Sequence, residues 1–180
     1  MINKKGDVWV SAVLYIALGM VLITLILSAG LPLIEKMRDK NTIIQTKRLL
    51  FNLNANIETV ANEGLGSRRY LSPFEISSGS LEIDSVKNLL VWKMTTKNVM
   101  MQPNPMNTLP VALETFKEGA LNMWMVETSV EGEYDIYIEL NYPSFAITTN
   151  TLTPLVGKYS LSVELVNFEG GKPVIYLNVL

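Results

Sequence analysis

The stretch VWVSAVLYIALGMVLITLILSAGLPLI, residues 8–34, contains no charged side chain. As an α-helix its about 27 residues extend roughly 40 Å, whereas the apolar core of a bilayer is about 30 Å thick. Its polar side chains Ser11, Thr24 and Ser28 are small and can hydrogen-bond to carbonyl groups of their own helix. A domain of this size rarely covers every face of so long a helix. The stretch therefore predicts a transmembrane segment over about residues 8–31.

The amino-acid composition excludes several classes of partner and of catalytic chemistry. The 180 residues carry a formal net charge of −2, so no basic excess points to nucleic acid as a partner. Histidine and cysteine are both absent from the sequence, which excludes imidazole bases, thiol nucleophiles, disulfides and zinc sites built on these ligands. The nucleotide-binding, hydrolase and zinc-protease motifs are missing as well. We therefore expect a protein that is not an enzyme, with no catalytic residues, no cofactor and no metal site.

The helical pattern continues beyond the apolar stretch, but on one side only. Apolar residues recur at spacings of three, four and seven, namely Ile43, Leu50, Leu53, Ile57 and Val60. Gly64 and Gly66 end the pattern. The spacing predicts one helix over residues 7–64 whose first half is apolar all round and whose second half is amphipathic. Gly30 and Pro32 are positions where that helix can bend.

Period-two alternation replaces the helical spacing after Gly66 and predicts a β-rich head over residues 65–180. Three hairpins are expected, within residues 80–94, 123–142 and 159–179. Residues 102–106 are expected to form a loop, and a short helix is possible near residues 111–118. Because each strand has one apolar face, we expect an antiparallel sheet covered by the amphipathic half of the helix, which is an α+β fold.

Several side chains in the head suggest binding chemistry, but an ordinary role is favoured for each. Arg68 and Arg69 would suit a phosphate or a glycan, and are more often a solvated turn. Tryptophans in strands, here Trp92 and Trp124, are usually packed rather than sugar-binding.

Methionines and carboxylates also cluster in the head. The methionines around the proline loop could bind copper(I) or pack against other apolar residues, and packing is favoured for Met100, Met101 and Met106. The carboxylates around one hairpin lack the spacing of a calcium loop, and a solvated tip is expected for Glu127, Glu131, Glu133 and Asp135.

The residues that precede the apolar stretch are Lys4-Lys5-Gly6-Asp7-Val8. A short basic segment ending in glycine against an apolar segment resembles the class III signal peptide of archaeal type IV pilin-like proteins. The resemblance implies a leader over residues 1–6, recognised through Lys4 and Lys5. It also implies cleavage between Gly6 and Asp7 by a prepilin peptidase, after which the apolar segment stays on the mature protein. Ser11 stands where bacterial pilins carry a glutamate, which archaeal relatives usually lack.

This resemblance also implies a type IV pilin-like fold and a structural role. The precursor would lie in the cell membrane, and the mature chain would form an extracellular pilus-like filament for adhesion or as a surface appendage. The implied partners are copies of the chain in a helical homopolymer, the prepilin peptidase, the membrane before assembly, and the pilus assembly platform with its ATPase. Close packing of the helices in the filament core is expected at Val8, Ala12, Ala17, Gly19 and Ala29.

Two other interpretations of the N-terminal segment remain open. It can be an uncleaved single-pass anchor that holds an extracytoplasmic β-rich binding or sensor module. It can also be a secretory signal peptide with a small-residue cleavage site at Ser28-Ala29-Gly30, although its apolar region is longer than usual. Basic residues flank the segment on both sides, so charge does not define the topology; they are Lys4, Lys5, Lys36, Arg38 and Lys40.

Overall fold

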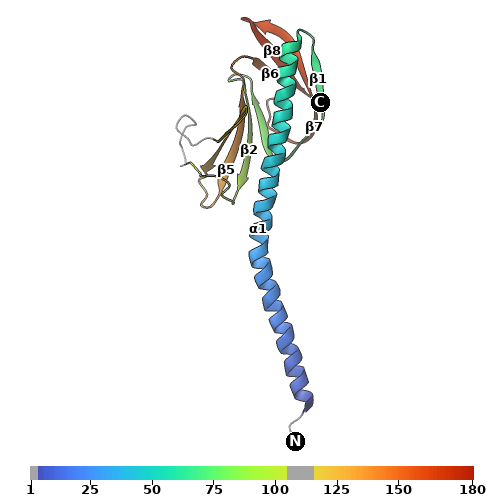
Figure 1. The fold of residues 1–180 in the computed structure, drawn as a ribbon, viewed down its shortest axis with the longest axis vertical. Coiled ribbons are helices and arrows are strands. Elements are labelled where there is room, and N and C mark those ends of the chain that lie inside the picture. The colour runs from blue at the N-terminus through green and yellow to red at the C-terminus, as the bar shows by residue number, and fades with distance from the viewer. Residues whose placement is uncertain (1–3, 105–115) are drawn as a thin grey trace. The chain divides into compact units, whose positions relative to one another are not determined.

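The computed structural model describes residues 4–104 and 116–180, with side chains described from Trp9 onward. The chain divides into two compact units, Met1–Asp39 and Lys40–Leu180. Helix α1 (Lys4–Glu63) contributes its first part to the first unit and its last part to the second (Figure 1). It starts three residues before the expected position, because a single glycine at position 6 weakens a helix without ending it.

The second unit contains one mixed sheet. Within the described residues its strands are β1 (Arg68–Asp84), β2 (Leu89–Thr96), β3 (Phe116–Glu118), β4 (Leu121–Glu127), β5 (Tyr134–Asn141), β6 (Ala146–Thr149), β7 (Leu155–Glu169) and β8 (Lys172–Val179). Their order across the sheet is β3-β4-β5-β2-β1-β7-β8-β6. The last part of α1 runs along this sheet, with β2 and β5 to one side and β1 and β7 to the other (Figure 1).

The three expected hairpins are confirmed. Strands β1 and β2 pair with Ile83 opposite Leu90, and β4 and β5 pair with Met123 opposite Ile138. Strands β7 and β8 pair through a turn at Gly170 and Gly171, both of which have positive φ values. Alternating apolar residues predicted these local pairings, and two of the three turns also contain glycine.

The expectation of a purely antiparallel sheet is wrong. Strand β6 pairs with β8 in parallel, with Ile147 opposite Ile175. The prediction rested on three hairpins and included no strand at residues 146–149. Strand β6 is only four residues long, and the chain between β5 and β6 carries it to the far edge of the sheet, beside a strand that comes much later in the sequence.

Two further expectations need correction. Arg68 and Arg69 do not lie in a loop but are the first residues of β1. Of the short helix expected near residues 111–118, the described part, Phe116–Glu118, is strand β3, paired with β4; the other positions lie outside the described residues. Pro105 and Met106 of the expected loop also lie outside the described residues. Asn104 of that loop forms an isolated parallel bridge with Val126.

The core lies between the sheet and the amphipathic part of α1. Leu53, Ile57 and Val60 are fully buried, and Leu50 and Ile43 are nearly so. They belong to one apolar cluster with strand residues that include Phe74, Trp92, Ile138, Val163 and Leu177. Since burial of each such side chain contributes about 1.5–3 kcal/mol, this contact fixes the helix on the sheet and confirms the predicted α+β arrangement.

Candidate functional site

The first unit exposes an apolar surface of unusual extent. Every valine, leucine, isoleucine, methionine and aromatic residue described from Trp9 to Ile34 is more than half exposed, from Leu22 at 51% to Trp9 at 76%. In the described part of the chain, α1 is the one helix long and apolar enough to cross a membrane, and none of its most apolar window is buried. Contiguous apolar surface of this kind marks a contact with lipid or protein. We therefore treat this segment as the candidate functional site.

Two of the small polar side chains in the segment are hydrogen-bonded to their own helix. The hydroxyl of Thr24 donates to the carbonyl oxygen of Met20 at 2.8 Å, and that of Ser28 donates to Leu25 at 3.0 Å. This confirms the expectation that small hydroxyl residues need no outside partner here. The segment can therefore enter an apolar environment without exposing an unpaired hydroxyl at these two positions.

The small residues expected at helix contacts lie on more than one face of the segment. Ala12 and Gly19 are seven residues apart and share a face, whereas Ala17 and Ala29 lie on other faces. A Cβ atom added at Gly19 would meet nothing within 4 Å. The packing of this single chain therefore does not require glycine at this position.

For the proposed leader residues from Lys4 onward, the structure describes the backbone only. The structure describes the backbone of Lys4, Lys5, Gly6, Asp7 and Val8 as helical, and their side chains lie outside the described residues. Cleavage between Gly6 and Asp7 and the packing role of Val8 stay predictions.

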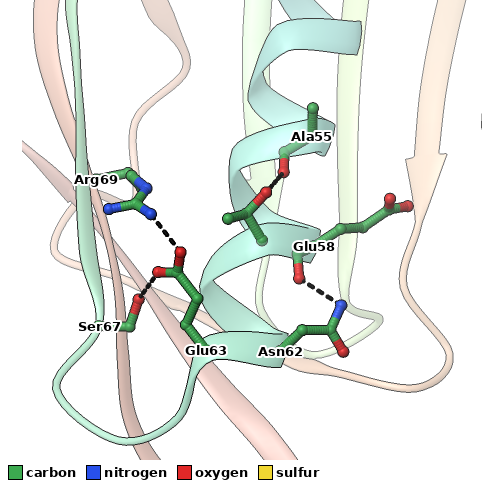
Figure 2. Close-up of polar contacts among 7 residues, drawn as sticks. Ala55, Glu58, Asn62, Glu63, Ser67 and Arg69 are labelled. Atoms are coloured by element: carbon green, nitrogen blue, oxygen red, sulfur yellow. Dashed lines mark hydrogen bonds and ion pairs between the residues drawn. The ribbon is translucent and has the colours of Figure 1, made fainter.

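The two arginines in the head are engaged in ion pairs rather than free to bind an anion. Arg68 donates from Nε and Nη2 to Glu164, the first contact at 2.8 Å, and this hydrogen bonding raises the pKa of the Arg68 guanidinium. Arg69 pairs with Glu63 at the end of α1, and the Ser67 hydroxyl also donates to that carboxylate at 2.6 Å (Figure 2). These contacts join the end of α1 and β7 to the start of β1.

The tryptophans have packing roles. Trp92 is fully buried, and its Nε1 donates to the carbonyl oxygen of Ser78 at 3.0 Å. Trp124 is 8% exposed and stacks on Tyr137 with ring centroids 5.3 Å apart. Neither ring presents an open face for a sugar.

Methionine and carboxylate clusters also have local roles. Met100 and Met101 are half-buried against the core, and Met106 lies outside the described residues. Asp135 pairs with Lys93 at 2.8 Å, which raises the pKa of that ammonium group. Within residues 4–104 and 116–180, no three histidine, cysteine, aspartate or glutamate residues are grouped so that they can hold a metal ion.

Sequence reasoning missed one polar arrangement on the solvent side of the sheet. Lys93 Nζ lies 5.5 Å from the ring centroid of Tyr137, which itself stacks on Trp124, and the Thr95 hydroxyl donates to Asp135 at 2.7 Å. These residues come from β2, β4 and β5. The alternation of each strand placed them on the outer face, but only the strand order reveals that they are neighbours.

The comparisons with known proteins assign no family. No family model matches the chain, and neither a curated protein nor a solved structure matches it.

Proposed function

We propose that this chain is the structural subunit of an archaeal type IV pilus-like extracellular filament. The precursor is held in the cell membrane by α1 and trimmed after Gly6 by a prepilin peptidase. The mature chains then assemble by packing of their N-terminal helices, with the aid of an assembly platform and its ATPase. The observation that carries the proposal is the exposed apolar segment from Trp9 to Ile34 on a helix that continues into the core of a β-rich head.

The physical reason for assembly is packing rather than removal of apolar surface from water. Lipid is already apolar, so helices associate in a membrane through van der Waals contact at small side chains. The chain provides these at Ala12, Ala17, Gly19 and Ala29, on several faces of the helix. A helix with small residues on several faces suits a bundle in which each copy has more than one neighbour.

A second function is supported by the division of the chain at residue 39. An apolar segment in one unit and a head in the other also suit a single-pass anchor with an extracytoplasmic binding or sensor module. That protein would remain dispersed in the membrane and would keep Met1.

The test is immunogold electron microscopy of surface material sheared from cells that produce the chain, or its Gly6→Val variant. We expect labelled filaments with the wild type and none with Gly6→Val, because a branched side chain blocks close approach of the peptidase to the backbone. A Gly19→Ala variant, which keeps a small residue, is the matched control and should form filaments. Labelled membrane without filaments for the wild type would instead favour the anchored module.

A further inference from the structure

The outward face of α1 in the second unit has an unusual composition. Residues at alternating spacings of four and three are all exposed, and we call this set the amide stripe: Asn41, Gln45, Arg48, Asn52, Ala55, Thr59 and Asn62. This spacing is the one at which a helix presents a continuous seam to another surface. Asparagine and threonine are poor helix formers, so the usual choice for a merely solvated face would be glutamate, lysine or arginine.

Two charged residues of this part of α1 pair with strands of the same chain, and a third is hydrogen-bonded within the helix. Lys47 pairs with Glu118 of β3, and Glu63 pairs with Arg69 of β1. Glu58 accepts a hydrogen bond from the Asn54 amide at 2.9 Å. The amide stripe itself is left with a single charged side chain, Arg48.

Local hydrogen bonds fix several of the polar side chains on or beside the stripe. The Asn62 amide donates to the carbonyl oxygen of Glu58 at 2.8 Å, and the Thr59 hydroxyl donates to that of Ala55 at 2.7 Å (Figure 2). Asn56 donates to the side-chain oxygen of Asn52 at 3.0 Å. The side chains of Asn41 and Gln45 form no hydrogen bond within the described part of the chain. Neutral amides both donate and accept, and they cost less to remove from water than charges do.

The charges of Arg48 and of the head indicate which surface contacts the amide stripe. Arg48 has no carboxylate partner among the described residues, whereas residues 64–180 contain twelve acidic and eight basic side chains. Several of these carboxylates lie together at the tip of the β4–β5 hairpin, at Glu127, Glu131 and Glu133. A second copy of the chain carries a negative surface of the kind that complements Arg48.

We infer that the amide stripe is a contact surface between copies of this chain, occupied by the acidic head of a neighbouring subunit with Arg48 at its centre. The inference rests on the proposed filament and adds to it a second interface, built from polar side chains. Because the chain has no cysteine, single-cysteine variants report on this interface without interference.

The experiment measures the rate at which a maleimide labels single cysteines in native cell-surface material and in detergent-dispersed subunits. The stripe variants are Asn52→Cys and Thr59→Cys; the controls, Val86→Cys and Leu152→Cys, replace head residues that are 92% and 98% exposed. We expect native material to label about fivefold or more slowly at the stripe and equally at the controls, since a packed interface excludes the reagent.

Equal labelling of the stripe in native and dispersed material would overturn the inference, whether or not filaments are seen. The proposed filament is judged separately, by microscopy of the same samples, so that its failure is distinguished from failure of the stripe. As a second measurement, Arg48→Glu should reduce the amount of filament about tenfold, whereas Lys97→Glu, an equal charge change at another exposed site, should not. Equal filament amounts for these two variants would show that Arg48 meets no acidic partner.

Discussion

The side-chain oxygen of Asn88 accepts a hydrogen bond from the backbone N–H of Ile147 at 2.9 Å. Asn88 precedes β2 and Ile147 lies in β6, so three strands separate them in the sheet. In a flat sheet the four intervening spacings would place them roughly 19 Å apart. The sheet must therefore curve strongly, and its curvature brings the β6 edge back toward the β1–β2 turn.

Removal of this contact should loosen the β6 edge. In Asn88→Ala the buried Ile147 loses the acceptor for its N–H, and the positive φ of 56° at position 88 becomes strained. We expect the free energy of unfolding to fall by about 1–3 kcal/mol. The measurement is urea unfolding of the full chain in detergent, followed by tryptophan fluorescence.

Asn88→Asp is the matched control, because aspartate keeps the acceptor oxygen and tolerates the same backbone conformation. It should unfold close to the wild type, and the Ile147 amide should keep its protection from hydrogen exchange. Equal stability of the Ala and Asp variants would show that the contact does not hold the edge of the sheet.

The two glycines at positions 79 and 132 have nearly the same φ values, 76° and 75°, but different surroundings. A Cβ atom at Gly79 would lie 2.3 Å from the carbonyl oxygen of Lys93, whereas one at Gly132 would meet nothing within 4 Å. Gly79→Ala should therefore cost roughly 3 kcal/mol or more of unfolding free energy, through strain and overlap together.

Gly132→Ala should show the conformational cost alone, about 1–2 kcal/mol. The difference between the two variants in unfolding free energy, measured by the same urea unfolding, gives the cost of the overlap between the added Cβ atom at position 79 and the β2 backbone. A similar loss in both would contradict the close approach of Gly79 to Lys93.

The hydroxyl of Tyr142 is buried and has no hydrogen-bond partner among the described residues. Burial, and then the negative charge of Glu58, raise the pKa of this phenol above its usual value of 10.0. Tyr142→Phe removes a polar group that is already unsatisfied, so at neutral pH it should leave stability unchanged or raise it by about 1 kcal/mol.

The same phenol makes stability depend on alkaline pH. Above pH 10 the unfolded chain loses the Tyr142 proton before the folded chain does, so unfolding releases a proton and the wild type loses stability as pH rises. Tyr142→Phe should lose less between pH 10 and pH 11 in urea unfolding. A wild-type slope for Tyr142→Phe would contradict the assignment.

Close packing at Gly19 predicts a loss of assembly without a loss of membrane insertion. Gly19→Leu adds a side chain where the single chain has open space, so the head should fold normally while helices of neighbouring copies are held apart. We expect far fewer filaments in electron micrographs and an unchanged amount of protein in the membrane. The control Leu18→Ile keeps the side-chain volume, and equal filament numbers in both variants would contradict packing at Gly19.

Much of the fold could be predicted because its signals are local. The spacing of Leu50, Leu53 and Ile57 marks the buried face of α1, and the turn glycines at positions 170 and 171 mark a hairpin. The exposed segment is likewise indicated by the absence of charged side chains from residues 8–34.

The remaining features depend on contacts distant in sequence. Nothing near Ile147 shows that it pairs with Ile175 or bonds to Asn88, because those contacts arise from the strand order and the curvature of the sheet. Likewise, the ion pair of Arg68 with Glu164 forms only once β7 pairs with β1. For the candidate site, the sequence identifies the apolar surface, whereas the packing partner proposed for it is a second copy of the chain, whose contacts no pattern within one chain specifies.

The central claim is that the apolar segment of α1 stays on the mature chain and joins copies of it into a filament. The most direct test is the intact mass of the subunit in filaments isolated from the cell surface. We predict the mass of a chain that begins at Asp7. A mass that includes Met1, or one that corresponds to a chain beginning near Leu31, would contradict the claim.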